Sequence, residues 1–165
     1  MLNWSCMENN EHLPRLIADA MLGKLARWLR VLGFDTLYMQ GDDHNIAAHA
    51  RAEDRILLTR DTELARRKGL RSILITSQVL SEQLAQVVHI LGVTQPPTAS
   101  RCMNCNGILK PISYEQARPL VPAYVARTQH HFQQCTNCQQ VYWQGTHWGK
   151  IKELRESAFM VNKTH

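Results

Sequence analysis

The chain has 165 residues, which is enough for one domain with a hydrophobic core and a small second module. Its 44% hydrophobic and 20% charged residues are typical of a soluble globular protein, and no apolar run approaches the ~18 residues of a membrane span. The N-terminus lacks the basic and apolar regions of a secretory signal, so we expect a cytoplasmic protein that binds no membrane. The net charge of +5 is compatible with a polyanionic partner but does not by itself indicate one.

Strand and helix patterns alternate along the first part of the chain, after an irregular extension expected at residues 1–14. Four short apolar runs predict strands, at residues 15–18, 36–39, 55–59 and 72–76. Apolar residues at helical spacing or a capping residue follow each run and predict helices, at about 22–32, 42–53, 61–68 and 80–91. This alternation predicts an α/β domain over residues 15–92, with a mostly parallel sheet flanked by helices.

The second part of the chain begins with a linker at residues 93–100, VTQPPTAS. Four of the five cysteines follow it as two Cys-x-x-Cys pairs, Cys102 with Cys105 and Cys135 with Cys138. Two thiolates on one tight turn converge on a point, and four thiolates favour Zn²⁺ in a closed structural site. We therefore expect a small zinc-ribbon module over residues 101–148, then a polar helical tail at 149–165. A redox dithiol or two disulfides are the competing interpretations.

Acidic residues stand at the ends of the first three predicted strands. They are Asp19, the pair Asp42 and Asp43, and Asp61. In an open parallel sheet the loops after the strands share one rim, so carboxylates from three segments should meet there. Clustered carboxylates need a cation, and oxygen ligands favour Mg²⁺ or Mn²⁺, which activate water for phosphodiester hydrolysis. Asp is also a favoured helix N-cap, so each residue could instead serve only as a cap.

Several other side chains are candidates for supporting roles near this rim. Thr59 lies two residues before Asp61 and could orient its carboxylate, and Glu63 could be an outer-shell ligand or simply an exposed helix residue. Basic and aromatic residues could contact nucleic acid. These are Lys24, Arg27, Arg30, Arg60, Trp143 and Trp148. Solvated helix faces, or rings that cover the small zinc module, would give the same pattern.

Four segments together resemble the Mut-seven C-terminal RNase family. They are DAMLGKLARWLRVLGFDT (19–36), RILLTRDTEL (55–64), RCMNCNG (101–107) and FQQCTNCQQVYWQGTHW (132–148). That family pairs a PIN-like nuclease domain with a C-terminal zinc ribbon. The resemblance therefore implies a PIN-like fold and a metal-dependent ribonuclease activity, with Asp19, Asp43 and Asp61 as the acidic residues and Asp43 favoured over Asp42.

The leading hypothesis is a ribonuclease that uses Mg²⁺ or Mn²⁺ at Asp19, Asp43 and Asp61. A structural zinc ribbon would help to bind the RNA, and no small-molecule cofactor is expected. The first alternative is a non-catalytic RNA- or ribosome-binding adaptor, in which the ribbon and the basic helix both serve as contacts. The second is a thiol-redox protein that uses the cysteine pairs.

Overall fold

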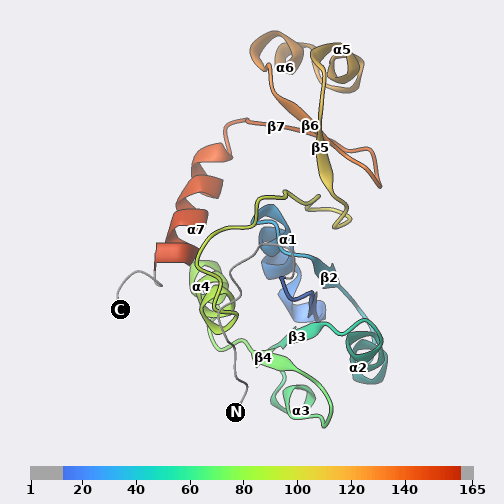
Figure 1. Cartoon of the computed structure of the whole chain (residues 1–165), viewed down its shortest axis with the longest axis vertical. Helices are drawn as coiled ribbons and strands as arrows, with labels where there is room; N and C mark the ends of the chain where they lie inside the picture. The colour runs from blue at the N-terminus through green and yellow to red at the C-terminus, as the bar shows by residue number, and fades with distance from the viewer. Residues whose placement is uncertain (1–12, 161–165) are drawn as a thin grey trace.

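Two β-sheets with their own helices make up the fold in the computed structural model, which describes residues 13–160 (Figure 1). A parallel sheet lies in the lower part of the view and a small antiparallel sheet lies above it. Most of the expected extension at residues 1–14 and the last five residues of the expected tail lie outside the described residues. None of the described helices is long and apolar enough to cross a membrane.

The first sheet has four parallel strands in the order β2-β1-β3-β4. The strands are β1 (Leu16–Ala18), β2 (Thr36–Tyr38), β3 (Ile56–Thr59) and β4 (Ser72–Leu74). β1 and β3 occupy the centre and are buried throughout, as their continuous apolar sequences require. All four strands fall within the predicted runs, and the mixed α/β class with a mostly parallel sheet is confirmed.

Helices cover both faces of this sheet because the side chains of each strand alternate in direction. On one face, Leu16 and Ala18 of β1 pack with the helices α1 (Gly23–Val31) and α4 (Leu80–Ile90). On the other face, Ile17 packs with α2 (Asp43–Ala52) and α3 (Thr62–Ala65). A single 3-10 turn, η1 (Ala20–Leu22), joins β1 to α1.

The strand order reverses between β1 and β3. The chain leaves β1 for β2 on one side, and then crosses over to β3 on the other side. Right-handed crossovers in opposite directions place α1 and α2 on opposite faces of the sheet, as observed. The carboxyl ends of β1 and β3 therefore lie at the point where the strand order reverses, which is where ligands bind in open α/β sheets.

The helix predicted over residues 61–68 is shorter than expected, since α3 ends at Ala65. The Ser72 hydroxyl, at the start of β4, donates a hydrogen bond of 2.6 Å to the Ala65 carbonyl. This bond occupies an acceptor that a longer helix would use, and the chain turns away through Gly69 at φ +76°. The side chains that follow, Arg66 to Lys68, are exposed.

The second sheet is antiparallel, in the order β5-β6-β7. Its strands are β5 (Leu109–Ile112), β6 (Phe132–Cys135) and β7 (Val141–Trp143). Three short helical segments that the sequence analysis did not predict connect β5 to β6. They are α5 (Tyr114–Ala117), which begins with a Ser113–Gln116 capping box, η2 (Arg118–Leu120) and α6 (Ala123–Thr128). Together with the strands they enclose a small core around Val125 and Phe132.

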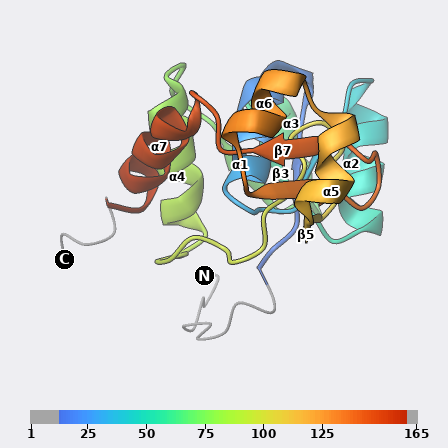
Figure 2. The same cartoon turned by 90° about the horizontal axis from the view of Figure 1, so that it is seen from above.

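The last helix, α7 (Trp148–Met160), runs from the second sheet down to α4 and lies beside it (Figures 1 and 2). Its residues Ala158 and Phe159 are buried in the same core as α1 and α4. The polar helical tail expected from the sequence therefore forms a helix, and this helix completes the hydrophobic core of the parallel sheet.

Candidate active site and zinc-binding centre

Asp19 directly follows β1, at the carboxyl end of the two central strands β1 and β3. Its side chain is only 5% exposed. One carboxylate oxygen, Oδ1, accepts a hydrogen bond of 3.0 Å from the Met21 amide and thereby caps η1. The other oxygen, Oδ2, accepts a short hydrogen bond from the Thr59 hydroxyl at the end of β3. Each carboxylate oxygen has a second lone pair, so this buried carboxylate can still bind a cation.

Thr59 connects the two central strands at this rim. Its hydroxyl donates to Asp19 and accepts a hydrogen bond of 3.0 Å from the Asp61 amide. The expectation that Thr59 orients the carboxylate of Asp61 is therefore wrong. Thr59 orients the carboxylate of Asp19 and positions the backbone of Asp61, because neighbouring strands bring residues 19 and 59 side by side.

Asp61 is an exposed N-cap of α3. Its Oδ1 atom accepts hydrogen bonds of 2.7 Å from the Glu63 amide and 2.9 Å from the Leu64 amide. Its Oδ2 atom has no hydrogen-bond donor among residues 13–160. Glu63 is exposed in the first turn of α3. Asp61 is thus a cap through one oxygen and leaves the other oxygen available.

Of the two acidic residues after β2, Asp42 is the helix cap. Both of its oxygens bind Asn45, through the backbone amide at 2.8 Å and the side-chain amide at 3.1 Å. Asp43 is the first residue of α2, and its Oδ2 atom lies 3.6 Å from the guanidinium of Arg67. Asp43 therefore keeps a carboxylate that is not held by backbone groups.

The three carboxylates lie on one rim but do not close around a point. Among residues 13–160, a single group of three or more possible metal ligands has its ligand atoms within 4.8 Å of one another, and that group is the four cysteines. Asp19, Asp43 and Asp61 therefore do not all lie within this distance of one another. A hard cation that retains several waters needs only one or two protein carboxylates, as Mg²⁺ usually has. The rim is therefore compatible with a Mg²⁺ site in which one or two carboxylates and several waters bind the ion.

The basic residues predicted to contact nucleic acid are not equivalent. Lys24 and Arg27 are exposed on α1, and Arg60 is partly exposed. Arg30 is 6% exposed, and its guanidinium donates to the carbonyls of Thr36 at 2.8 Å and Met103 at 2.9 Å. The prediction that Arg30 contacts nucleic acid is therefore corrected, since this side chain joins the two sheets.

The four cysteine thiols converge as the spacing predicted. The Sγ atoms of Cys102 and Cys138 are 3.6 Å apart, and those of Cys105 and Cys135 are 3.4 Å apart. A tetrahedral ion with Zn–S bonds of ~2.3 Å requires Sγ atoms about 3.8 Å apart, which is close to these distances. Both distances are much longer than a disulfide bond of ~2.05 Å. The cluster could therefore hold zinc, and it contains no disulfide.

The two cysteine turns have the same local structure. In each turn the residue after the second cysteine, Asn106 or Gln139, has a positive φ, +68° or +64°. Gly107 follows Asn106, and a Cβ atom there would lie 2.6 Å from the Cys135 sulfur. Only glycine leaves room for the second turn to approach. Backbone amides of Gly107 and Asn137 point at the thiols of Cys105 and Cys135, both at 3.4 Å.

The cysteine thiols differ in pKa, and therefore in how readily each one ionises. Desolvation would raise the pKa of Cys105, but hydrogen bonds from Asn137 and from the Gly107 amide lower it to about 6. The Gln140 amide would lower the pKa of Cys138, but desolvation and the neighbouring thiols raise it to about 12. One thiolate thus opposes the ionisation of another, and a bound cation would relieve that repulsion.

A partly buried network fixes the first cysteine turn to the parallel sheet. Asn106 accepts a hydrogen bond of 3.0 Å from the Thr36 amide and donates one of 2.8 Å to Asp35. Asp35 also forms an ion pair of 2.7 Å with Arg55. The sequence analysis missed this network. Local signals were weak, because Arg55 resembled an exposed residue that flanks a strand and Asn106 a turn residue.

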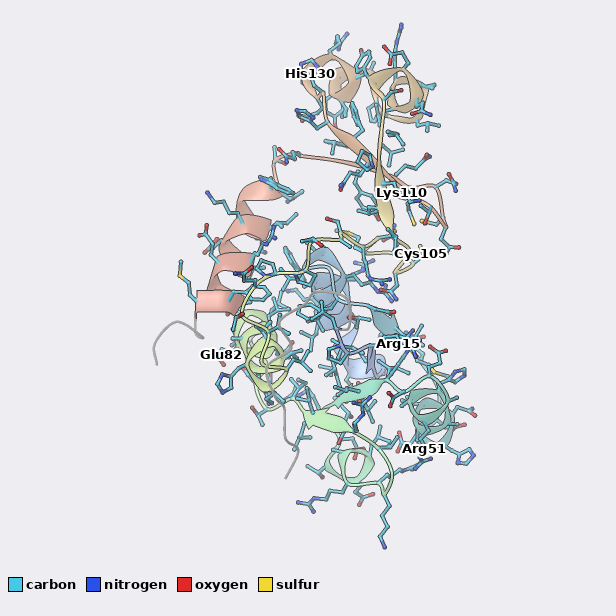
Figure 3. All side chains as sticks on the ribbon, in the orientation of Figure 1. Arg15, Arg51, Glu82, Cys105, Lys110 and His130 are labelled. Carbon is cyan, nitrogen blue, oxygen red and sulfur yellow. The ribbon has the colours of Figure 1, made fainter. Side chains whose placement is uncertain are left out.

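The cysteine centre and the acidic rim lie at opposite ends of the parallel sheet. Asp35 and Arg55 precede β2 and β3, so the network lies at the amino ends of the strands. Asp19 and Asp61 lie at the carboxyl ends. Figure 3 shows Cys105 on the side of the second sheet that faces α1 and β2. The helix α1 spans the distance between the two ends, about 14 Å for nine residues.

The two tryptophans of the second sheet differ in exposure. Trp143, at the end of β7, is half-buried, whereas Trp148, at the start of α7, is 44% exposed. The hydroxyl of the neighbouring Tyr142 lies 3.0 Å from the Cys102 sulfur. Burial and the neighbouring thiols raise the pKa of Tyr142, so its hydroxyl keeps its proton and shares a hydrogen bond with the sulfur. The cysteine centre therefore holds the Tyr142 ring in place.

Comparison with known proteins agrees with the resemblance found in the sequence. A segment of 101 residues is 36% identical to the exonuclease mut-7 homolog of Homo sapiens, which corresponds to 56% of this chain and to 12% of that protein. This chain therefore matches only a small part of that relative. No solved structure matches the chain. The family model described as the Mut7-C RNAse domain matches residues 14–155, from before β1 into α7, and the chain belongs to this family.

Proposed function

We propose that the protein is a metal-dependent ribonuclease whose active site is the carboxyl rim of β1 and β3. Membership of a nuclease family supports the class of reaction. The observation that carries the proposal is Asp19, a carboxylate that is 5% exposed and held by Thr59 at the point where the strand order reverses. A buried carboxylate at this place destabilises the folded state unless it is paired, and a bound cation would pair it.

The residues at this rim fit a hard divalent cation, Mg²⁺ or Mn²⁺. Asp19 would bind it through an oxygen that Thr59 orients, and Asp61 through Oδ2, which has no other partner among the described residues. Asp43 would approach from the end of β2. A cation bound there would lower the pKa of a water and stabilise the leaving oxygen of a phosphodiester.

The remaining residues in the proposal bind and position the substrate. Lys24 lies in the first turn of α1, close to the rim, and Arg27 follows one turn later. Both are exposed and could hold phosphates of RNA. The zinc bound by the four cysteines would be structural, because four thiolates leave no open position for water. The ribbon would aid RNA binding from the opposite end of the sheet.

A specific observation also favours a second candidate, a non-catalytic RNA-binding adaptor. Asp42 and Asp61 cap helices, Asp43 pairs with Arg67, and the carboxylates do not converge within 4.8 Å. A rim that has lost its metal would keep these structural roles. Under this candidate the exposed cations of α1 and the ribbon would bind RNA without turnover.

Cleavage of labelled RNAs tests the two candidates. We expect the wild type to cleave RNA when Mn²⁺ is present, and Asp19→Asn to bind RNA with cleavage reduced by at least about 100-fold. Asparagine can still cap η1 through its one side-chain oxygen, and its NH2 group would then face the Thr59 hydroxyl as a donor instead of an acceptor. We expect this variant to fold, and thermal unfolding checks this. Asp54→Asn is the matched control, because Asp54 is exposed after α2, away from the rim.

Two results decide against the nuclease. If wild type and Asp19→Asn cleave RNA at equal rates, the cleavage does not come from this rim. If neither cleaves any RNA in the panel while both bind it with equal affinity, the adaptor is the correct function.

A further inference from the structure

A cleft of about 440 Å³ lies between the second sheet, the first turns of α7 and the end of α1. We call it the ribbon cleft. Its walls include Arg101, His130, Tyr142, Trp143, Trp148 and Arg155. His130 lies at the end of the second sheet far from α1 (Figure 3), whereas Val31 lines the cleft at the end of α1. The cleft is therefore long enough to take an extended segment and not only a compact small molecule.

The charge of the ribbon cleft suits an anion. Its charged lining consists of the cations Arg101 and Arg155, accompanied by His130 and His131, and no carboxylate lines the cleft among residues 13–160. Arg101 is held in place through a hydrogen bond of 3.0 Å to the Asn106 carbonyl and an ion pair of 3.8 Å with Asp35, which offsets part of its charge. Arg155 is exposed and has no carboxylate partner in the described part of the chain. A free guanidinium beside an uncharged wall is suited to a phosphate.

Aromatic rings form part of the uncharged wall of the ribbon cleft. Trp148 is 44% exposed, which is unusual for a large ring in a folded module, and Trp143, which also lines the cleft, is half-buried. Tyr142 is fixed by its contact with Cys102. Bases of single-stranded nucleic acid stack on such rings regardless of their sequence, while cations at the rim follow the backbone.

From these features we propose that the ribbon cleft binds an unpaired segment of RNA, with a base stacked on Trp148 and its phosphate on Arg155. This inference rests on the proposed function, which supplies RNA as the ligand. The cleft lies at the amino end of the parallel sheet and the acidic rim at the carboxyl end. The two sites would therefore hold different parts of one strand, and binding in the cleft does not require the catalytic metal.

Fluorescence anisotropy with a labelled oligouridylate tests the proposal, in buffer without Mg²⁺, Mn²⁺ or chelator so that no cleavage occurs and zinc stays bound. We expect Trp148→Ala to weaken binding about tenfold and to leave its salt dependence unchanged, because stacking releases no counterions. Arg155→Ala should weaken binding and lower the slope of log K against log salt by about 0.7.

The matched controls are Tyr124→Ala and Arg127→Ala on α6. Tyr124 is 63% exposed and Arg127 is exposed, and neither lines the cleft. Both control variants should bind like the wild type. The proposal is overturned if Trp148→Ala loses no more affinity than Tyr124→Ala, or if duplex RNA competes as well as the single strand. If every variant binds RNA with wild-type affinity, the proposal is also overturned, and a protein partner becomes the better candidate ligand of the cleft.

The experiments distinguish a failure of RNA binding in the cleft from a failure of the proposed nuclease activity. If cleft variants lose RNA binding while no protein cleaves RNA with Mn²⁺, the cleft is confirmed and the nuclease is not. If cleavage depends on Asp19 but the cleft variants bind and cleave like the wild type, the nuclease stands and the cleft proposal fails.

Discussion

The ion pair between Asp35 and Arg55 can be compared with a second pair of equal length in the same chain. The nitrogen–oxygen distance is 2.7 Å in this pair and also in the pair between Asp54 and Arg71. The side chains of Asp35 and Arg55 are 21% and 9% exposed, whereas those of Asp54 and Arg71 are 83% and 39% exposed. Burial therefore differs while the contact geometry does not.

We expect Asp35→Asn to lower the free energy of unfolding by about 2–3 kcal/mol. The variant leaves Arg55 without one of its two carboxylate partners, although Glu53 still lies 2.6 Å away and limits the loss. For a protein of this size the melting temperature should fall by roughly 5–10 °C. Asp54→Asn should cost less than about 1 kcal/mol, because exposed ion pairs contribute little. Asparagine also tolerates the positive φ of +52° at position 54.

The pH dependence gives this prediction a second test. Burial alone would raise the pKa of Asp35, but the hydrogen bonds from Arg55 and Asn106 hold it below its usual value. The ionised carboxylate therefore contributes stability above the unfolded pKa of about 3.9, and this stability is lost as the pH falls through the lower folded pKa. The difference between wild type and Asp35→Asn should be complete at neutral pH and shrink below about pH 4.

Urea denaturation of the wild type and both variants measures these differences. Loss of zinc in acid would affect all three proteins, so the difference between them remains informative. Equal destabilisation by Asp35→Asn and Asp54→Asn would refute the argument from burial. A difference that does not change with pH would refute the assignment to the charge of Asp35.

Three further predictions follow from other parts of the structure. Phe159→Ala should lower the free energy of unfolding, measured by urea denaturation, by about 3–5 kcal/mol, because this side chain is buried. Met160→Ala should lower it by less than about 0.5 kcal/mol, because this side chain is 60% exposed. Gly33→Ala should destabilise more than Gly41→Ala, because both have positive φ but only at Gly33 would the new Cβ meet a linker carbonyl oxygen, at 2.4 Å. Elemental analysis should find one zinc ion per chain in the wild type and none in Cys102→Ser. A Cys102→Ser variant that binds zinc with wild-type affinity would contradict the assignment of the four cysteines as ligands.

The parallel sheet could be predicted because its signals are local. Each strand is a short apolar run that ends at a polar residue, and Gly33 and Gly92 mark helix ends with φ of +100° and +66°. The cysteine cluster was equally accessible, since two identical spacings converge on one ion. In these elements the pattern within a few residues determines the structure.

The features that were missed depend on residues far apart in the chain. Arg30 has the helical spacing of an exposed cation, but besides the Thr36 carbonyl its acceptors include the Met103 carbonyl in the cysteine turn, more than seventy residues later. Phe159 lies near the end of a tail that is polar over most of its length, and only its packing with α4 reveals it as a core residue. Thr59 was recognised, but its partner Asp19 is set by strand pairing.

The central claim is that the rim of β1 and β3 binds a catalytic divalent cation. Crystals of the protein soaked in Mn²⁺ test it most directly, through anomalous scattering at the manganese edge. We expect a manganese peak between Asp19 and Asp61, about 2.0–2.2 Å from a carboxylate oxygen of each, and a separate zinc peak at Cys102, Cys105, Cys135 and Cys138. A zinc peak at the cysteines with no manganese at the rim, at saturating Mn²⁺, would contradict the claim.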